Sequence, residues 1–204
     1  MSYIYAKQKD VTELNKWCLN VIHSVQRNLK DYFTFDIRLI GSGEKRLVTI
    51  DSNGCFDLDY NLIIQKDKQE LLNNPKSIKN LFINAFDSVL SKEVKGYSHT
   101  YDSTSVVKNT IVFDNRYHFK FDVAIVVKAD NDSYYKLVND YGNYIWNQIR
   151  DSKNYIERYL SIKQNGFFND FKDRYLELKN HHANRRDGAK SFSIFLETLN
   201  DFET

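Results

Sequence analysis

An alternating segment that carries two acidic residues most constrains how this chain can fold. Polar and apolar residues alternate between positions 56 and 64, the apolar ones being Phe56, Leu58, Tyr60 and Leu62. This period of two predicts a β-strand with one buried face. Asp57 and Asp59 then share the polar face, because side chains two residues apart on a strand point the same way. Two neighbouring carboxylates repel each other unless a cation lies between them, so the pattern indicates a site for a hard divalent cation.

A third acidic residue lies within an apolar segment further along the chain. Residues 117–127 predict a strand, and Asp122 follows Phe119 and Phe121 in it. A buried carboxylate is costly without a partner, so Asp122 is the candidate for a third ligand. Asp114 is the alternative, but the pair Asp114-Asn115 is more typical of a hairpin turn than of a strand.

Composition indicates a globular protein with a packed core. The 204 residues include 14 Tyr and 14 Phe, which suffice for a packed core, and the net charge of +2 gives no indication of a general nucleic-acid coat. No segment resembles a membrane span or a signal peptide. The two cysteines are too few for a disulfide framework, so we expect a protein of the reducing cytoplasm with no membrane partner.

Periodicity outlines the remaining elements. We expect helices over residues 10–29 and from Asn74-Pro75 to about 90, and a strand over residues 32–40 that ends at Gly41-Ser42-Gly43. Residues 134–146 predict a hairpin, with a helix as the alternative. Three helical stripes follow residue 152, with a polar loop at 181–190. The predicted domains are therefore a core over residues 1–150 with an N-terminal helix, and a helical C-terminal portion over 151–204 packed on it.

The order of these motifs resembles the DNA polymerase β-like nucleotidyltransferase superfamily. Its pattern is a strand into Gly-Ser, then Asp-x-Asp on a strand, then one more Asp on a later strand, and this chain has Gly41-Ser42, Asp57-Leu58-Asp59 and Asp122. The resemblance covers residues 30–130. It implies an α+β fold in which a mixed sheet forms a polymerase β-like core with flanking helices and a helical C-terminal portion.

The resemblance also implies roles for these residues. Asp57 and Asp59 would hold two Mg²⁺ ions, for which Mn²⁺ can substitute, and Asp122 would complete the metal site at the acceptor hydroxyl. Gly41 would allow close backbone approach, and the Ser42 hydroxyl would donate to a phosphate oxygen of the nucleotide.

A weaker similarity links the C-terminal part to the branch that holds oligoadenylate synthetases, CCA-adding enzymes and cyclic-nucleotide synthetases. In that branch a helix ends in Leu-Lys and a later Ser begins another helix, as do Leu178-Lys179 and Ser191-Phe192 here. Carried over, Lys179 and Ser191 would bind triphosphate, with Ser193 as an alternative to Ser191. The alternative is a purely structural role, in which Ser191 caps a helix and Lys179 is a solvated charge.

The sequence thus predicts a Mg²⁺-dependent nucleotidyltransferase. It would move a nucleoside monophosphate from an NTP, with ATP as the expected one, to an acceptor hydroxyl and release pyrophosphate. The acceptor is left open among a small molecule, a nucleotide, an RNA end and a protein. The alternative is a non-catalytic nucleotide-binding or partner-binding module, of a defence or toxin–antitoxin kind, on the same scaffold. A third hypothesis is metal-dependent hydrolysis of a phosphodiester.

Overall fold

The computed structural model describes residues 2–113, 117–149 and 153–202. Inter-residue contacts divide the chain into two compact units. The sheet unit comprises residues 7–48 and 55–149, and the helical unit comprises residues 1–6, 49–54 and 150–204. The predicted division into domains at residue 150 stays a prediction, and each unit is described by itself below.

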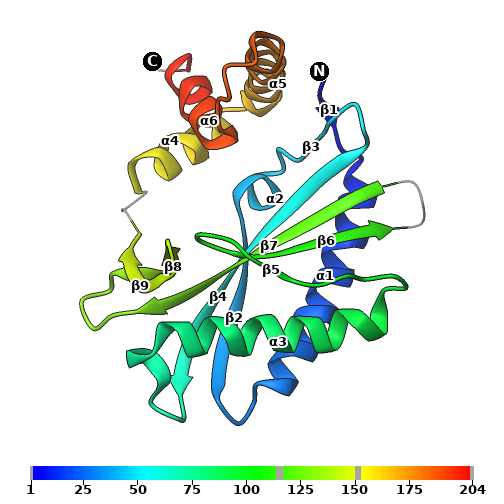
Figure 1. The fold of residues 1–204 in the computed structure, drawn as a ribbon. Coiled ribbons are helices and arrows are strands. Elements are labelled where there is room, and N and C mark those ends of the chain that lie inside the picture. Colours follow the sequence, from blue (N-terminus) through cyan, green and yellow to red (C-terminus); the bar gives the residue numbers. More distant parts are fainter. Residues whose placement is uncertain (1, 114–116, 150–152, 203–204) are drawn as a thin grey trace. The chain divides into compact units, whose positions relative to one another are not determined.

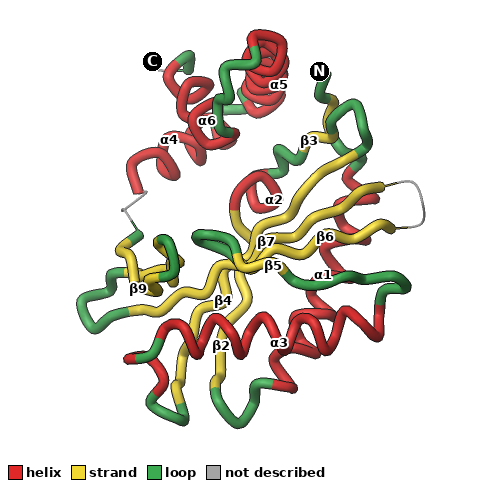
Figure 2. Tube along the Cα trace, in the orientation of Figure 1, coloured by secondary structure: helices red, strands yellow, loops and turns green. Residues whose placement is uncertain are grey.

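The sheet unit is built on a mixed sheet with the strand order β2-β4-β7-β6-β5 (Figure 2). Its central strands β4 and β7 run parallel, and the other neighbours in this order run antiparallel. Beyond the end of β6, the hairpin of β8 and β9 continues the sheet from β7. The strands are β2 (Phe33–Ile40), β4 (Cys55–Asp67), β5 (Tyr101–Asp102), β6 (Val107–Phe113), β7 (Tyr117–Lys128), β8 (Tyr134–Asp140) and β9 (Asn143–Gln148).

Two long helices, α1 (Gln8–Asn28) and α3 (Pro75–Glu93), cover one face of this sheet (Figure 1). Trp17 of α1 meets the rings of Phe119 and Phe121 edge-on, and Phe86 of α3 meets Phe121 in the same way. Because side chains alternate along a strand, even-numbered residues of β7 such as Asp122 point to the opposite face. The aromatic core therefore determines which side of the sheet carries the acidic residues.

Local signals explain how several elements begin. Helix α3 starts at Pro75, as predicted, and the Asn74 side chain accepts a hydrogen bond from the Ser77 backbone N–H at 3.2 Å. The hairpin interpretation of residues 134–146 is confirmed by β8 and β9. The sequence indicates only that the strand before Gly41-Ser42-Gly43 ends there, and in the structure Gly41–Lys45 forms the short helix α2. The short 3₁₀ helix η1 (Leu71–Asn73) precedes α3.

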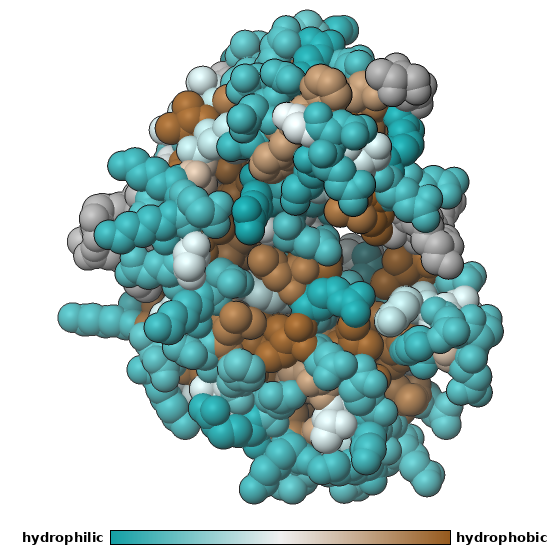
Figure 3. Space-filling view, turned by 180° about the vertical axis from the view of Figure 1, so that it is seen from behind, coloured by the Kyte–Doolittle hydropathy of each residue, from teal (hydrophilic) through white to brown (hydrophobic). Residues whose placement is uncertain are grey.

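The helical unit contains α4 (Lys153–Gln164), α5 (Phe168–Arg185) and α6 (Ser191–Asn200), with a two-stranded ladder of β1 (Ile4–Tyr5) and β3 (Thr49–Ile50). Tyr159, Phe171 and Phe195 pack against one another edge to face and join the three helices. The predicted loop at 181–190 is too long, because α5 continues to Arg185. In the described part of the chain no helix is both long and apolar enough to cross a membrane, and hydrophilic side chains cover most of the surface in Figure 3.

An ion pair between the buried Lys79 and the more exposed Asp102 joins α3 to the β5 edge of the sheet unit. The Lys79 side chain is 1% exposed, and its Nζ lies 3.1 Å from Asp102 Oδ1 and donates to the Ser103 carbonyl at 3.0 Å. Asp102 Oδ2 also accepts from Asn139 Nδ2 at 3.0 Å and from the Tyr144 hydroxyl at 2.5 Å. These donors hold the pKa of Asp102 below its usual value against the effect of burial. Asp102 therefore connects the helix, the sheet edge and the hairpin.

We expect Asp102→Ala to lower the free energy of unfolding by about 3 kcal/mol, because it leaves the Lys79 ammonium buried without its counter-charge. Urea denaturation followed by circular dichroism measures this difference. Asp130→Ala, at an exposed turn position, is the control and should change stability by less than about 0.5 kcal/mol. Equal stability of Asp102→Ala and the parent chain would contradict the assigned role.

Candidate functional site

The three predicted carboxylates lie on adjacent parallel strands of the sheet unit. Asp59 of β4 is the direct cross-strand partner of Asp122 of β7. Neighbouring strands are about 4.8 Å apart, so these two residues start from adjacent backbone positions. Asp57 precedes Asp59 by two residues and shares its face. The structure thus places the three acidic residues, up to 65 positions apart in the chain, on one face of two adjacent strands.

These carboxylates occupy the face of the sheet opposite α1 and α3. On β4 the alternate residues Leu58 and Tyr60 are completely buried, whereas Asp57 is exposed and Asp59 is half-buried. Further along the same face, Ile63, Ala124 and Val126 form a small apolar cluster that is joined by Val106 and Tyr134. The acidic residues therefore lie between solvent and an apolar patch.

This position raises the pKa of two of the carboxyl groups. Burial raises the pKa of Asp59 to about 7, and the nearby charges of Asp57 and Asp122 add to the effect. Burial likewise raises the pKa of Asp122 to about 6, with Lys108 acting in the opposite direction. Desolvation and like-charge repulsion both disfavour the ionised carboxylates, so a cation bound here would stabilise their ionised form.

Asp122 Oδ1 is buried and has no hydrogen-bond partner in the described part of the chain. A buried acceptor without a partner is rare in folded proteins and points to a missing ligand. The donor types, three carboxylates, suit Mg²⁺. However, no group of three His, Cys, Asp or Glu side chains among residues 2–113, 117–149 and 153–202 is arranged so that it could hold a metal ion. The ligand chemistry fits, and the side chains as placed do not converge.

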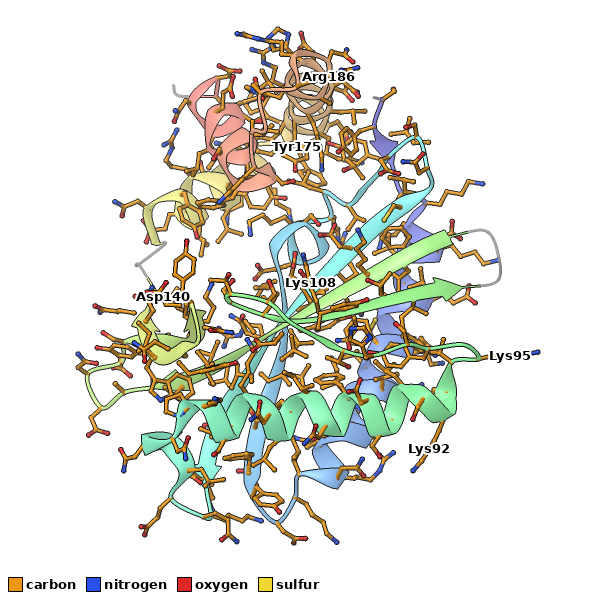
Figure 4. The ribbon with its side chains drawn as sticks, viewed as in Figure 1. Lys92, Lys95, Lys108, Asp140, Tyr175 and Arg186 are labelled. Atoms are coloured by element: carbon orange, nitrogen blue, oxygen red, sulfur yellow. The ribbon has the colours of Figure 1, made fainter. Side chains whose placement is uncertain are left out.

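Basic residues flank the acidic ones, and the sequence did not reveal this. Lys108 of β6 is the cross-strand partner of Asp122, and Lys120 of β7 is the partner of Asp57. Lys108 is exposed and lies near the middle of the sheet in Figure 4. The alternation along each strand predicts which face a side chain occupies. Its partner on the neighbouring strand depends on register, which the sequence does not show. The alternative ligand Asp114 lies outside the described residues.

Gly41 lies against the Asp59 carboxylate. Ile40, the last residue of β2, pairs with Asp59 and leads directly into α2. Gly41 has a φ of +66°, which favours glycine, and a Cβ added there would lie 2.9 Å from Asp59 Oδ2. The Ser42 carbonyl accepts a hydrogen bond from the Leu47 N–H at 2.9 Å, which closes α2. The predicted nucleotide-binding residue Gly41 thus adjoins the predicted metal ligand Asp59, and Ser42 follows it in α2.

Lys179 and Ser191, the other predicted nucleotide-binding residues, come together in the helical unit. Lys179 Nζ donates to Ser191 Oγ at 3.4 Å and to Thr49 Oγ1 at 2.6 Å. The ammonium also lies 4.7 Å from the centroid of the Tyr3 ring. Ser191 is the first residue of α6, and its contact with Lys179 favours it over Ser193. The pair therefore places an ammonium and a hydroxyl side by side, and their binding of phosphate stays a prediction.

Known proteins resemble this chain in structure and not in sequence. No protein-family model matches the chain, and no curated protein matches it either. Solved structures do match. A Vibrio cholerae cyclic AMP-GMP synthase, DncV, in complex with a linear intermediate superposes with a TM-score of 0.72 at 11% identity, over 98% of this chain and 68% of that one.

Two further structures agree with this match. The STING-associated c-di-GMP synthase CdnE of Capnocytophaga granulosa gives a TM-score of 0.65 at 16% identity, over 97% of this chain. A 3′-deoxy ATP-bound form of the Vibrio cholerae protein gives 0.60 at 15% identity, over 91% of this chain and 51% of that one. This chain spans only 61% of the length of the Capnocytophaga protein. The predicted mixed α and β fold is thereby confirmed.

Proposed function

We propose that this chain, which has the polymerase β-like nucleotidyltransferase fold, is a Mg²⁺-dependent nucleotidyltransferase. It would transfer a nucleoside monophosphate from an NTP, with ATP as the expected donor, to an acceptor hydroxyl. One observation carries the proposal. Asp59 and Asp122 are cross-strand partners with Asp57 on the same face, and Asp122 Oδ1 is buried without a partner in the described residues.

Each residue has a role in this reaction. Asp57, Asp59 and Asp122 would hold the metal ions, and bound Mg²⁺ would neutralise the triphosphate charge and acidify the acceptor hydroxyl. The Asp122 carboxylate would accept the proton of that hydroxyl as its oxygen bonds to the α-phosphorus. The bond from the α-phosphorus to the bridging oxygen then breaks, and pyrophosphate leaves.

Nucleotide binding would use four further residues. Gly41 permits a phosphate to approach the backbone beside Asp59, and the Ser42 hydroxyl would donate to a phosphate oxygen. The Lys179 ammonium and the Ser191 hydroxyl, 3.4 Å apart, would bind the triphosphate. The acceptor is not specified by these contacts, so a small molecule, a nucleotide, an RNA end and a protein are all candidates.

A non-catalytic nucleotide-binding module is the second candidate function. It is favoured by the finding that the acidic side chains in the described part of the chain do not converge into a metal-holding group. Such a module would bind NTP through the same Gly41, Ser42, Lys179 and Ser191 and release no pyrophosphate. It has no need of three acidic residues on one face, which is why the enzyme is preferred.

The test is incubation of the purified chain with each of the four NTPs, Mg²⁺ or Mn²⁺, and a cell extract freed of small nucleotides as the source of acceptor. We expect pyrophosphate release that requires the divalent cation and is lost on adding EDTA. Mass spectrometry of the products identifies the base and the acceptor. NTP binding without pyrophosphate would instead favour the module, and product from a phosphodiester without any NTP would indicate hydrolysis.

A further inference from the structure

His182 in the helical unit lies between two carboxylates. Its Nδ1 is 2.7 Å from Asp187 Oδ2, and its Nε2 is 2.8 Å from Glu197 Oε2. The His182 side chain is 19% exposed, so the ring is partly buried. The sequence alone does not reveal these contacts, because Asp187 and Glu197 form no local sequence motif with His182.

This triplet joins three segments. His182 belongs to the last turn of α5, which ends at Arg185, and Arg186 follows in the left-handed conformation (Figure 4). Asp187 lies in the loop, where its Oδ1 accepts from the Ala189 N–H at 3.1 Å. Glu197 lies on α6. The contacts of His182 therefore tie the end of α5 to both the loop and α6.

The same two helices carry the proposed phosphate-binding pair. Lys179 precedes His182 by three residues, so both lie on one face of α5. Ser191 begins α6, which places it between Asp187 and Glu197 in the chain. Lys179 Nζ lies 3.4 Å from Ser191 Oγ. His182 contacts Asp187 before Ser191 and Glu197 after it. The contacts of His182 thus join the two helices that carry the ammonium and the hydroxyl.

Only a protonated imidazole can make both contacts as a donor. The imidazolium has two N–H groups, whereas the neutral ring donates one and presents a lone pair to the other carboxylate. Asp187 and then Glu197 raise the pKa of His182 above its ordinary value, and His182 in turn lowers the pKa of Asp187. Among the described residues, the His181 ring centroid lies 5.8 Å from that of His182, and Arg185 also lowers the pKa of Asp187.

We infer that His182 is a positioning residue that holds Lys179 and Ser191 at the spacing needed for nucleotide phosphate, so that nucleotide affinity falls as pH rises. This inference rests on the proposed function. The direction of the pH dependence follows from linkage. A histidine whose pKa is raised in the folded state stabilises, at low pH, the form in which His182 contacts both carboxylates. That stabilisation is lost as the pH passes from the unfolded pKa of about 6.5 through the higher folded pKa.

The experiment measures binding of a non-hydrolysable NTP analogue with Mg²⁺ at about pH 6 and about pH 9, well either side of an ordinary histidine pKa. His182→Arg keeps a permanent donor to both carboxylates, and His182→Gln removes the charge. We expect the wild type to match His182→Arg at low pH and His182→Gln at high pH, with a difference of about fivefold in the dissociation constant. Titration of the analogue itself is common to all variants and cancels.

His181→Gln, at the adjacent exposed position, is the matched control and should keep the wild-type pH dependence. The double variant Asp187→Asn with Glu197→Gln removes both carboxylates that His182 contacts, and it should bind the analogue weakly at both pH values. The same pH dependence in the wild type, His182→Arg and His182→Gln would overturn the inference while leaving the proposed function intact. Failure of the wild type to bind the analogue at either pH would overturn the proposed function, and the inference with it.

Discussion

Asp59→Asn is expected to lower the rate of pyrophosphate release by about a thousandfold or more. Asp59 lies between Asp57 on its own strand and Asp122 on the next, so it is the central acidic residue of the three. Asparagine has nearly the same shape and loses only the negative charge. A fall in rate of this size would therefore report the charge of Asp59 and not its packing. The assay is pyrophosphate release under saturating NTP and Mg²⁺.

The same substitution should stabilise the metal-free chain. Burial and the charges of Asp57 and Asp122 raise the pKa of Asp59 to about 7, so the ionised form is disfavoured in the folded state. As pH rises from about 4 through 7, folding loses stability, because the unfolded carboxyl group ionises first. At pH 8 Asp59→Asn removes this cost, and we expect a gain of about 2 kcal/mol in unfolding free energy. Loss of activity with a gain of stability distinguishes a functional acid from a structural one.

Asp36→Asn is the matched control for Asp59→Asn. Asp36 is exposed on β2 of the same sheet, where its Oδ2 accepts from Gln65 Nε2 at 2.9 Å, and asparagine can still accept that bond. Activity and stability should both stay close to the parent chain. Wild-type activity in Asp59→Asn would refute the acidic site, as would an equal loss in Asp36→Asn.

Gly41→Ala is expected to lower activity by about a hundredfold. The added methyl group would lie 2.9 Å from Asp59 Oδ2, so the carboxylate must move. A displacement of about 1 Å of a group that positions reactants can cost two orders of magnitude in rate. The φ of +66° at this position adds a backbone cost of about 1 kcal/mol for alanine. Measurement of kcat and KM for NTP, together with urea denaturation, separates the two effects.

Gly96→Ala isolates the backbone cost. Gly96 has a φ of +77° in the same unit, and an added Cβ would meet nothing within 4 Å. We expect a similar loss of stability and no loss of activity. Comparable losses of activity in Gly41→Ala and Gly96→Ala would mean that backbone strain, and not the displacement of Asp59, explains the first result.

Local geometry made much of the site predictable. The alternation of residues 56–64 placed Asp57 and Asp59 on one face, because the direction of a side chain on a strand depends only on its position in that strand. Asn74-Pro75 predicted the start of α3, because a proline ring suits the first helical turn. The short helix that begins at Gly41 was not predictable, because a segment with two glycines is typical of a turn.

The sequence by itself determined that two acidic side chains share a strand face and that a third lies in a later apolar strand. Only the tertiary structure decided that Asp122 stands directly opposite Asp59, with Lys108 beyond it. It alone brought His182 between Asp187 and Glu197. The physical reason is that the direction of a side chain is a property of the local backbone, whereas its partners follow from strand register and helix packing. These depend on the whole chain burying its apolar faces together.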